Sequence, residues 1–187
     1  MTVRLLAFAA SLRHGSLNRR LLAPAVEVAR AHGAEVDLAE FAEFDMPLFN
    51  HDVLEATGLP AGAQEFARRI QAADGMLIAS PEYNYSLPGT LKNAIDWVSR
   101  IKPMPFRGRT AFLMAASGGL VGGIRGLWQL RIPLEGCGVV VYPDMFALSS
   151  APHAFDDAGG LKDPQVRERL ERMMRGYLKM AEALRQQ

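Results

Sequence analysis

Five short apolar runs are spread along the chain, and stretches with helical periodicity separate them. The runs are nearly continuous rather than alternating, which is typical of strands buried on both faces of a parallel sheet. A β-α pattern repeated five times predicts a doubly wound α/β fold, with helices on both faces and strand order 2-1-3-4-5. The predicted strands span residues 3–9, 34–38, 75–79, 110–116 and 139–142, and the last of them resumes around residues 145–148.

Helices are expected between these strands, where apolar residues recur every three to four positions. Gly33 marks the end of the first helix, and Asp163 followed by Pro164 marks the start of the last. Pro133 is expected to end or kink the fourth helix. The predicted helices span about residues 18–32, 61–73, 88–98, 124–134 and 164–187. Residues 41–50 form a connector, of which residues 45–50 are extended on the surface and cover either a partner subunit or the chain's own core.

The loop after the first strand carries polar groups in front of a helix. Hydroxyls from Ser11 and Ser16 and the guanidinium of Arg13 precede a helix in which Asn18 is a cap or first-turn residue. A phosphate group needs such hydroxyls and a cation beside the positive end of a helix dipole. A solvated loop with a serine cap explains the same residues equally well.

Two further loops follow neighbouring strands, at the sheet edge where open α/β folds bind ligands. Residues 81–87 form a rigid loop with two tyrosines and no catalytic cysteine or histidine, which suits a flat polar ligand. Residues 117–123 include four glycines, which allow a ligand to approach the backbone closely. A flexible hinge is the alternative for the glycine loop, but its place at the same sheet edge favours a ligand.

Composition excludes several classes of function. The 187 residues suit one domain, and a net charge of +1 gives no general attraction to nucleic acid or to an anionic membrane. A single cysteine, Cys137, excludes an internal disulfide, and no signal peptide or spanning segment is visible, so we expect a cytoplasmic protein. His51 and Asp52 have no companions that complete a metal site. Neither a G-x-G-x-x-G nor a GK[ST] motif is present.

The motif PEYN-x-S-x-PG-x-LKNAIDW runs from Pro81 to Trp97 without a break. It resembles the NADPH-dependent FMN reductase family of flavodoxin-like proteins, which includes quinone, chromate and azo reductases. Tyr85 agrees with the chromate and quinone reductase branch. The family's S-G-G-x-x-G-G-x-R pattern matches Ser117 to Arg125, and its G-S-x-R-x-x-S-x-N pattern is matched except that Ala10 replaces the first glycine.

The resemblance implies a cofactor, a reaction and a set of site residues. FMN would accept hydride from NADPH or NADH at its N5 atom and pass electrons to a quinone, chromate, azo compound or free flavin in a ping-pong reaction. No catalytic side chain and no metal are expected. The phosphate would contact Ser11, Arg13, Ser16, Leu17 and Asn18. On one side the flavin ring would contact Pro81, Glu82, Tyr83 and Asn84, mostly through their backbone. On its other side the ring would contact Ser117, Gly118 and Gly119. The alternative is a flavodoxin-like electron carrier or flavin-binding sensor without turnover.

Self-association is expected as well, because members of the family that the chain resembles are dimers or tetramers. Apolar residues 46–49 on one side of the site, with Tyr85 and Trp97 on the other, would form an exposed patch on a monomer. The apolar patch would join two subunits into a homodimer. A second contact between subunits would hold a polar cluster of Arg125, Asp144 and Tyr85 and would give a homotetramer. The alternative is that Arg125 and Asp144 are separately solvated.

Overall fold

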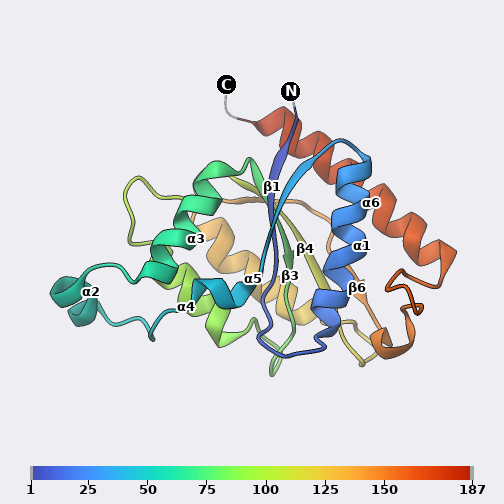
Figure 1. Ribbon diagram of the computed structural model, residues 1–187, viewed down its shortest axis with the longest axis horizontal. Coiled ribbons are helices and arrows are strands. Elements are labelled where there is room, and N and C mark those ends of the chain that lie inside the picture. The colour runs from blue at the N-terminus through green and yellow to red at the C-terminus, as the bar shows by residue number, and fades with distance from the viewer. Residues whose placement is uncertain (1, 186–187) are drawn as a thin grey trace.

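The computed structural model describes residues 2–185, in which a parallel sheet is covered by helices on both faces (Figure 1). The strand order is β2-β1-β3-β4-β5, and β6 also pairs with β4. This is the strand order of the flavodoxin-like fold, so the predicted fold class is confirmed. The strands are β1 (Arg4–Ala9), β2 (Glu35–Ala39), β3 (Gly75–Ala79), β4 (Thr110–Ala116), β5 (Val140–Val141) and β6 (Phe146–Leu148).

Successive residues of β1 point into two separate cores. Leu5 and Ala7 pack in the core with α1 and α6, whereas Leu6 and Phe8 pack in the core with α3, α4 and α5. This alternation is the period-two geometry of a strand that is buried on both faces. The large helices are α1 (Leu17–Ala31), α3 (Ala61–Ala72), α4 (Gly89–Val98), α5 (Ile124–Gly136) and α6 (Pro164–Leu184).

The fifth strand position of the sheet is occupied in two pieces. Val140 and Val141 pair with the start of β4, and Phe146–Leu148 pairs with its end. Residues 142–145 between them include Pro143, which has no N–H to donate, and Asp144, which carries a charge. The break predicted from the sequence is therefore confirmed, and the two pieces count as β5 and β6.

One predicted boundary was wrong. Helix α5 continues through Pro133 to Gly136, because a proline in the last turn removes only one helical hydrogen bond. The connector at 41–50 begins with η1 (Phe41–Phe44), a 3-10 helix whose two phenylalanines are buried, and residues 45–50 after it form neither helix nor strand. Both rings pack against Phe8 and Phe66, so the connector completes an aromatic cluster in the core.

An arm formed by residues 45–60 projects from the body of the molecule and ends in α2 (His51–Thr57), which the sequence did not predict (Figure 1). Helix α2 buries none of its residues. Asn93 of α4 accepts a hydrogen bond from Phe49 N at 2.7 Å and donates one to Pro47 O at 2.9 Å, which fixes the base of the arm.

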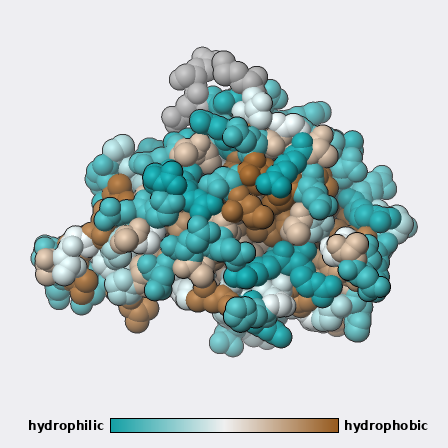
Figure 2. Space-filling view, viewed as in Figure 1, coloured by the Kyte–Doolittle hydropathy of each residue, from teal (hydrophilic) through white to brown (hydrophobic). Residues whose placement is uncertain are grey.

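Trp97 lies under the same segment and is fully buried, with its indole N–H donating to Pro47 O at 2.7 Å. The prediction that Trp97 belongs to an exposed patch was therefore wrong. Leu48 is 83% exposed, and Figure 2 shows apolar side chains on this side of the molecule, at the left. No helix within residues 2–185 has both the length and the apolar character needed to cross a bilayer.

Candidate functional site

Three loops lie at the carboxyl edge of the sheet, below the strands in Figure 1. We name them the β1 loop (residues 10–16), the β3 loop (80–88) and the β4 loop (117–123). Strands β1, β3 and β4 are immediate neighbours and run parallel, so the loops that follow them lie side by side. The structure thus brings together all three segments that the sequence assigned to a ligand site.

The β1 loop presents unsatisfied donors at the N-terminus of α1. Ser16 is the N-cap, and its Oγ accepts hydrogen bonds from the N–H groups of Asn18 and Arg19 at 3.2 and 3.4 Å. Within residues 2–185, none of the backbone N–H groups of residues 12–17 donates a hydrogen bond. Arg13 is exposed and forms no ion pair with any described residue. These groups together suit a phosphate, which is an anion that accepts several hydrogen bonds.

Asn18 ties the β1 loop to the end of β4. Its side chain is buried, donates to Ala116 O at 3.1 Å and accepts from Ala116 N at 2.9 Å. Asn18 is the second residue of α1, so it is a first-turn residue and not the cap. Its amide orients two loops relative to each other, a role that the sequence did not reveal, and one amide N–H remains for a ligand.

A tight turn fixes the β3 loop. Tyr83 and Ser86 exchange two backbone hydrogen bonds of 2.9 and 3.0 Å, and the two residues between them have positive φ angles, 49° at Asn84 and 68° at Tyr85. Two positive φ angles define a type I′ turn, which is unfavourable for a tyrosine. Pro81 is buried, whereas Tyr83, Asn84 and Tyr85 are exposed at the tip. The loop is therefore rigid and turns its aromatic side chains toward solvent.

The carboxylate of Glu82 binds the first turn of α5. It accepts hydrogen bonds from the backbone N–H groups of Arg125 and Gly126 at 3.1 and 3.2 Å, and the Arg125 guanidinium lies 2.6 Å from it. The N-cap of α5 is Gly123, which has no side chain, so Glu82 supplies the acceptor that this helix end lacks. The sequence resemblance implies that Glu82 acts mostly through its backbone; the structure shows in addition that its side chain holds the N-terminus of α5.

Electrostatics around this pair favour its charged form. Although burial alone would raise the pKa of Glu82, hydrogen bonds from Arg125 and from Gly126 lower it below its ordinary value. The hydrogen bond to Glu82 raises the pKa of Arg125, whose guanidinium also lies 4.0 Å from the centre of the Tyr85 ring. Arg125 is therefore engaged within its own chain, and the alternative of a separately solvated Arg125 was wrong. Asp144 lines a separate groove and forms no ion pair with Arg125 among the described residues, so the predicted cluster across a subunit contact stays a prediction.

The four glycines of the β4 loop divide into two pairs. Gly122 and Gly123 have φ angles of 64° and 87°, and a Cβ on either would lie 2.9 Å from neighbouring atoms, so the turn itself requires both. Gly118 and Gly119 are exposed, and a Cβ on them would meet nothing closer than 3.7 Å. Ser117 Oγ accepts a hydrogen bond from Gly119 N at 3.2 Å and shapes this open half of the loop. The open pair is the half that a ligand can approach.

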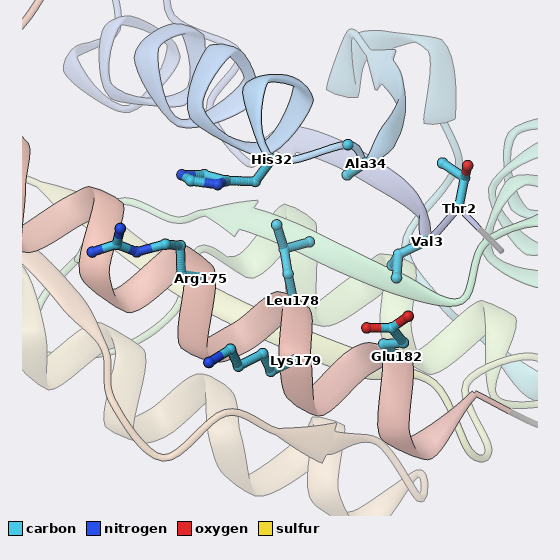
Figure 3. A pocket seen from close by; sticks show the side chains of 9 residues that line it. Thr2, Val3, His32, Ala34, Arg175, Leu178, Lys179 and Glu182 are labelled. Carbon is cyan, nitrogen blue, oxygen red and sulfur yellow. The ribbon is translucent and has the colours of Figure 1, made fainter.

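A separate cavity of about 270 Å³ lies between the end of α1 and α6, where Val3 precedes β1 (Figure 3). His32 and Arg175 at its rim both approach the Glu171 carboxylate, at 3.4 and 3.7 Å. This cavity contains none of the predicted site residues. Among residues 2–185, no group of three or more metal-binding side chains is present either.

Known proteins resemble this chain in sequence and in fold. The family model for NADPH-dependent FMN reductases matches residues 3–153. The NAD(P)H-dependent FMN reductase of Pseudomonas aeruginosa is 39% identical over 174 residues, which cover 92% of this chain and 91% of that protein. The probable NADPH:quinone oxidoreductase 2 of Oryza sativa subsp. japonica is 37% identical, covering 92% and 85%. The flavoenzyme NAD(P)H:(acceptor) oxidoreductase of Paracoccus denitrificans superposes with a TM-score of 0.84 at 25% identity, covering 97% and 98%.

The fold and these relatives define the protein as an oxidoreductase enzyme of flavodoxin-like architecture. The chain belongs to the NADPH-dependent FMN reductase family, and its cofactors are FMN and NAD(P)H. The family resemblance seen in the sequence is thereby confirmed.

Replacing Glu82 by glutamine tests the link between the β3 loop and α5. The substitution keeps the shape of the side chain and removes its charge, so we expect the free energy of unfolding at pH 7 to fall by about 1–3 kcal/mol. The folded-state pKa of Glu82 is lowered. The stabilisation is therefore present above the unfolded pKa of about 4.3 and lost as the pH falls through the folded value. Urea unfolding of both proteins from pH 7 to about pH 3 measures this difference.

Glu65→Gln provides the matched control. Among residues 2–185, Glu65 pairs only with Arg68, three residues away on the exposed face of α3, so its loss should change the unfolding midpoint little. Equal destabilisation by the two substitutions, or a Glu82→Gln effect that persists at the lowest pH, would contradict the role assigned to Glu82.

Proposed function

We propose that residues 1–187 form one FMN-binding domain that uses NAD(P)H to reduce a quinone or a related small electron acceptor. The observation that carries this proposal is the meeting of two kinds of loop at one sheet edge. The β1 loop offers unsatisfied donors to an anion, and the β3 and β4 loops flank it with a rigid aromatic turn and open glycines. A phosphate group joined to a flat ring system matches this arrangement, and FMN has that form.

The phosphate end of FMN is assigned to the β1 loop. Backbone N–H groups from residues 12–17 and the hydroxyls of Ser11 and Ser16 surround the helix end, and Arg13 supplies a positive charge. The positive end of the α1 dipole favours an anion at this place. Leu17 and Asn18 begin the helix behind it, and the bond from Asn18 to Ala116 keeps the loop in register with β4.

The ring end is assigned to the space between the β3 and β4 loops. Pro81 and Tyr83 hold one side through a backbone fixed by the type I′ turn, with Asn84 at its tip, and Ser117, Gly118 and Gly119 form the other side. FMN bound here would accept hydride and then release electrons, so the reactive atoms belong to the cofactor. The chain contributes the position of the cofactor and the electrostatics around it.

Quinones are the acceptor class that the relatives favour. The aligned rice protein is named as a probable NADPH:quinone oxidoreductase, and the aligned bacterial protein is named as an FMN reductase. Chromate, azo compounds and free flavins remain proposed acceptors, because an open ring face admits each of them. These names also favour a reductase over an electron carrier or a sensor, and the net charge of +1 differs from the strong acidity of carrier flavodoxins.

Arg13→Ala tests the phosphate assignment. The substitution removes one charge-assisted hydrogen bond to the phosphate, so the dissociation constant for FMN should rise roughly tenfold or more. Affinity for riboflavin, which lacks the phosphate, should not change. Titration of apoprotein followed by flavin fluorescence measures both constants.

Arg30→Ala serves as the control, because Arg30 lies at the opposite end of the same helix, where its guanidinium donates a hydrogen bond to Val36 O. It should leave both affinities unchanged. The phosphate assignment is wrong if wild-type apoprotein binds FMN and riboflavin equally well.

The order of substrates follows from the shared ring face. If NAD(P)H and the acceptor occupy the same open side in turn, initial rates at several fixed acceptor concentrations should give parallel double-reciprocal lines. Product inhibition by NAD(P)⁺ should be competitive with the acceptor. Converging lines, together with direct detection of a ternary complex, would show that the two substrates bind at separate places.

Self-association is proposed through the arm and the exposed face of α5. Four large apolar side chains are between 53% and 92% exposed: Leu48 on the arm, Leu120 on the β4 loop, and Trp128 and Ile132 on α5. Several large apolar side chains exposed on a monomer surface are typical of an interface, and a second copy of the chain offers the same groups by twofold symmetry. Helix α2, with no buried residue of its own, would gain its packing from that copy.

Sedimentation velocity at micromolar concentration tests this proposal. The wild type should sediment as a homodimer or homotetramer, and Leu48→Glu should shift it toward the monomer because a charge would enter the interface. Leu184→Glu changes a 45% exposed leucine at the end of α6 and should leave the oligomer intact. A monomeric wild type would reject self-association, whereas an unchanged Leu48→Glu oligomer would exclude only the arm.

A further inference from the structure

A groove runs along α6 beside the open edge of the sheet. The part next to residues 147–154 has a volume of about 780 Å³, and the part next to residues 142–145 has a volume of about 390 Å³. Both parts are lined by Arg169 and Arg172. The two arginines lie three residues apart on α6, so they share one face of the helix. We call this feature the α6 groove. Its other walls are Ser149, Ser150 and His153 after β6, and Tyr142 and Met145 between β5 and β6.

The two guanidinium groups have no carboxylate partner among residues 2–185. Arg169 stacks 4.4 Å from the centre of the buried Phe146 ring and donates to Ala147 O at 2.9 Å, but its buried Nε has no hydrogen-bond partner. Burial, followed by repulsion from Arg172, lowers the pKa of Arg169. A half-buried cation without a counterion is unfavourable, and an anion placed between the two arginines would offset that cost.

The acidic residues along the groove do not neutralise it. The carboxylate of Asp163 caps α6 by accepting from Gln165 N at 2.8 Å. Asp144 and Glu168 also line the groove, yet neither forms an ion pair with Arg169 or Arg172 in the described chain. Other arginines differ: Arg69 is held by Asp37 and Glu43, and Arg125 by Glu82. Arg169 and Arg172 therefore lie side by side in this groove without a counterion among residues 2–185.

The α6 groove begins directly behind the β4 loop. Ala151 N donates to Ser117 O at 3.0 Å, and a Cβ on Gly118 would lie 3.8 Å from the Pro152 ring. Ser150 and His153, on either side of these contacts, form the end of the groove. A ligand lying on the ring face beside Ser117 thus has a continuous path over residues 150–153 to the arginine pair.

We propose that Arg169 and Arg172 bind the 2′-phosphate of NADPH, an inference that rests on the proposed function. When the nicotinamide of NADPH lies on the flavin ring, the adenosine half of the dinucleotide must extend away from that ring. The α6 groove leads away from the proposed ring site and offers a place for it. A phosphomonoester carries close to two negative charges and accepts paired hydrogen bonds from arginine forks. NADH has a hydroxyl at the same position, so the arginine pair distinguishes the two co-substrates.

Binding of adenosine fragments tests the assignment without requiring turnover. Wild-type holoenzyme should bind 2′,5′-ADP at least tenfold more tightly than ADP by calorimetry. Arg172→Ala should abolish this difference, since Arg172 is exposed and its loss leaves the core intact. Arg167→Ala, on an exposed position of the same helix outside the groove, should retain it. Equal binding of both fragments by the wild type would overturn the proposal.

Two further measurements distinguish a failure of the 2′-phosphate assignment from a failure of the proposed reductase function. The wild-type preference for NADPH over NADH, as a ratio of kcat/KM values, should fall roughly tenfold or more in Arg172→Ala. An unchanged ratio in an active enzyme would overturn the 2′-phosphate assignment and leave the proposed reductase function standing. If inorganic phosphate binds as tightly as 2′,5′-ADP and also depends on Arg172, the groove holds a free phosphate and the nucleotide assignment is wrong.

Discussion

The carboxylate of Glu82 is the interaction on which the geometry of the site depends most. Glu82 belongs to the rigid loop after β3, and its carboxylate accepts hydrogen bonds from the N–H groups of Arg125 and Gly126, the second and third residues of α5. The same carboxylate binds the Arg125 guanidinium, which in turn lies over the Tyr85 ring. One buried charge therefore fixes the two loops that flank the ring site, and the strained turn at Asn84 and Tyr85 is held in place by these contacts.

Asn18 fixes the loop geometry at the proposed phosphate end of the site. Its amide joins the first turn of α1 to the last residue of β4, so the β1 loop cannot move independently of the β4 loop. The side chains that fix the loops are buried or paired, whereas the β1-loop N–H groups, Gly118 and Gly119 stay open. This division matches a preorganised site, in which binding needs little further ordering of the protein.

The sequence predicted the sheet because continuous apolar runs and helical periodicity are local signals, and it predicted the three loops because parallel strands place their carboxyl ends together. It did not reveal the roles of Glu82 and Asn18, since each pairs with a residue 43 or more positions away. It placed Trp97 on the surface because periodicity alone does not show that residues 46–49 fold over it. Helix α2 was missed because it buries nothing, and so its sequence carries no apolar stripe.

Hydrogen exchange followed by mass spectrometry, with and without FMN, tests most directly the claim that these three loops are the flavin site. We expect amides 12–17 and those of the open half of the β4 loop to become strongly protected on binding. Tyr83 and Ser86 should change little, because their N–H groups are already hydrogen-bonded to each other's carbonyls. Protection confined to other parts of the chain, with the β1 loop exchanging as fast as before, would contradict it.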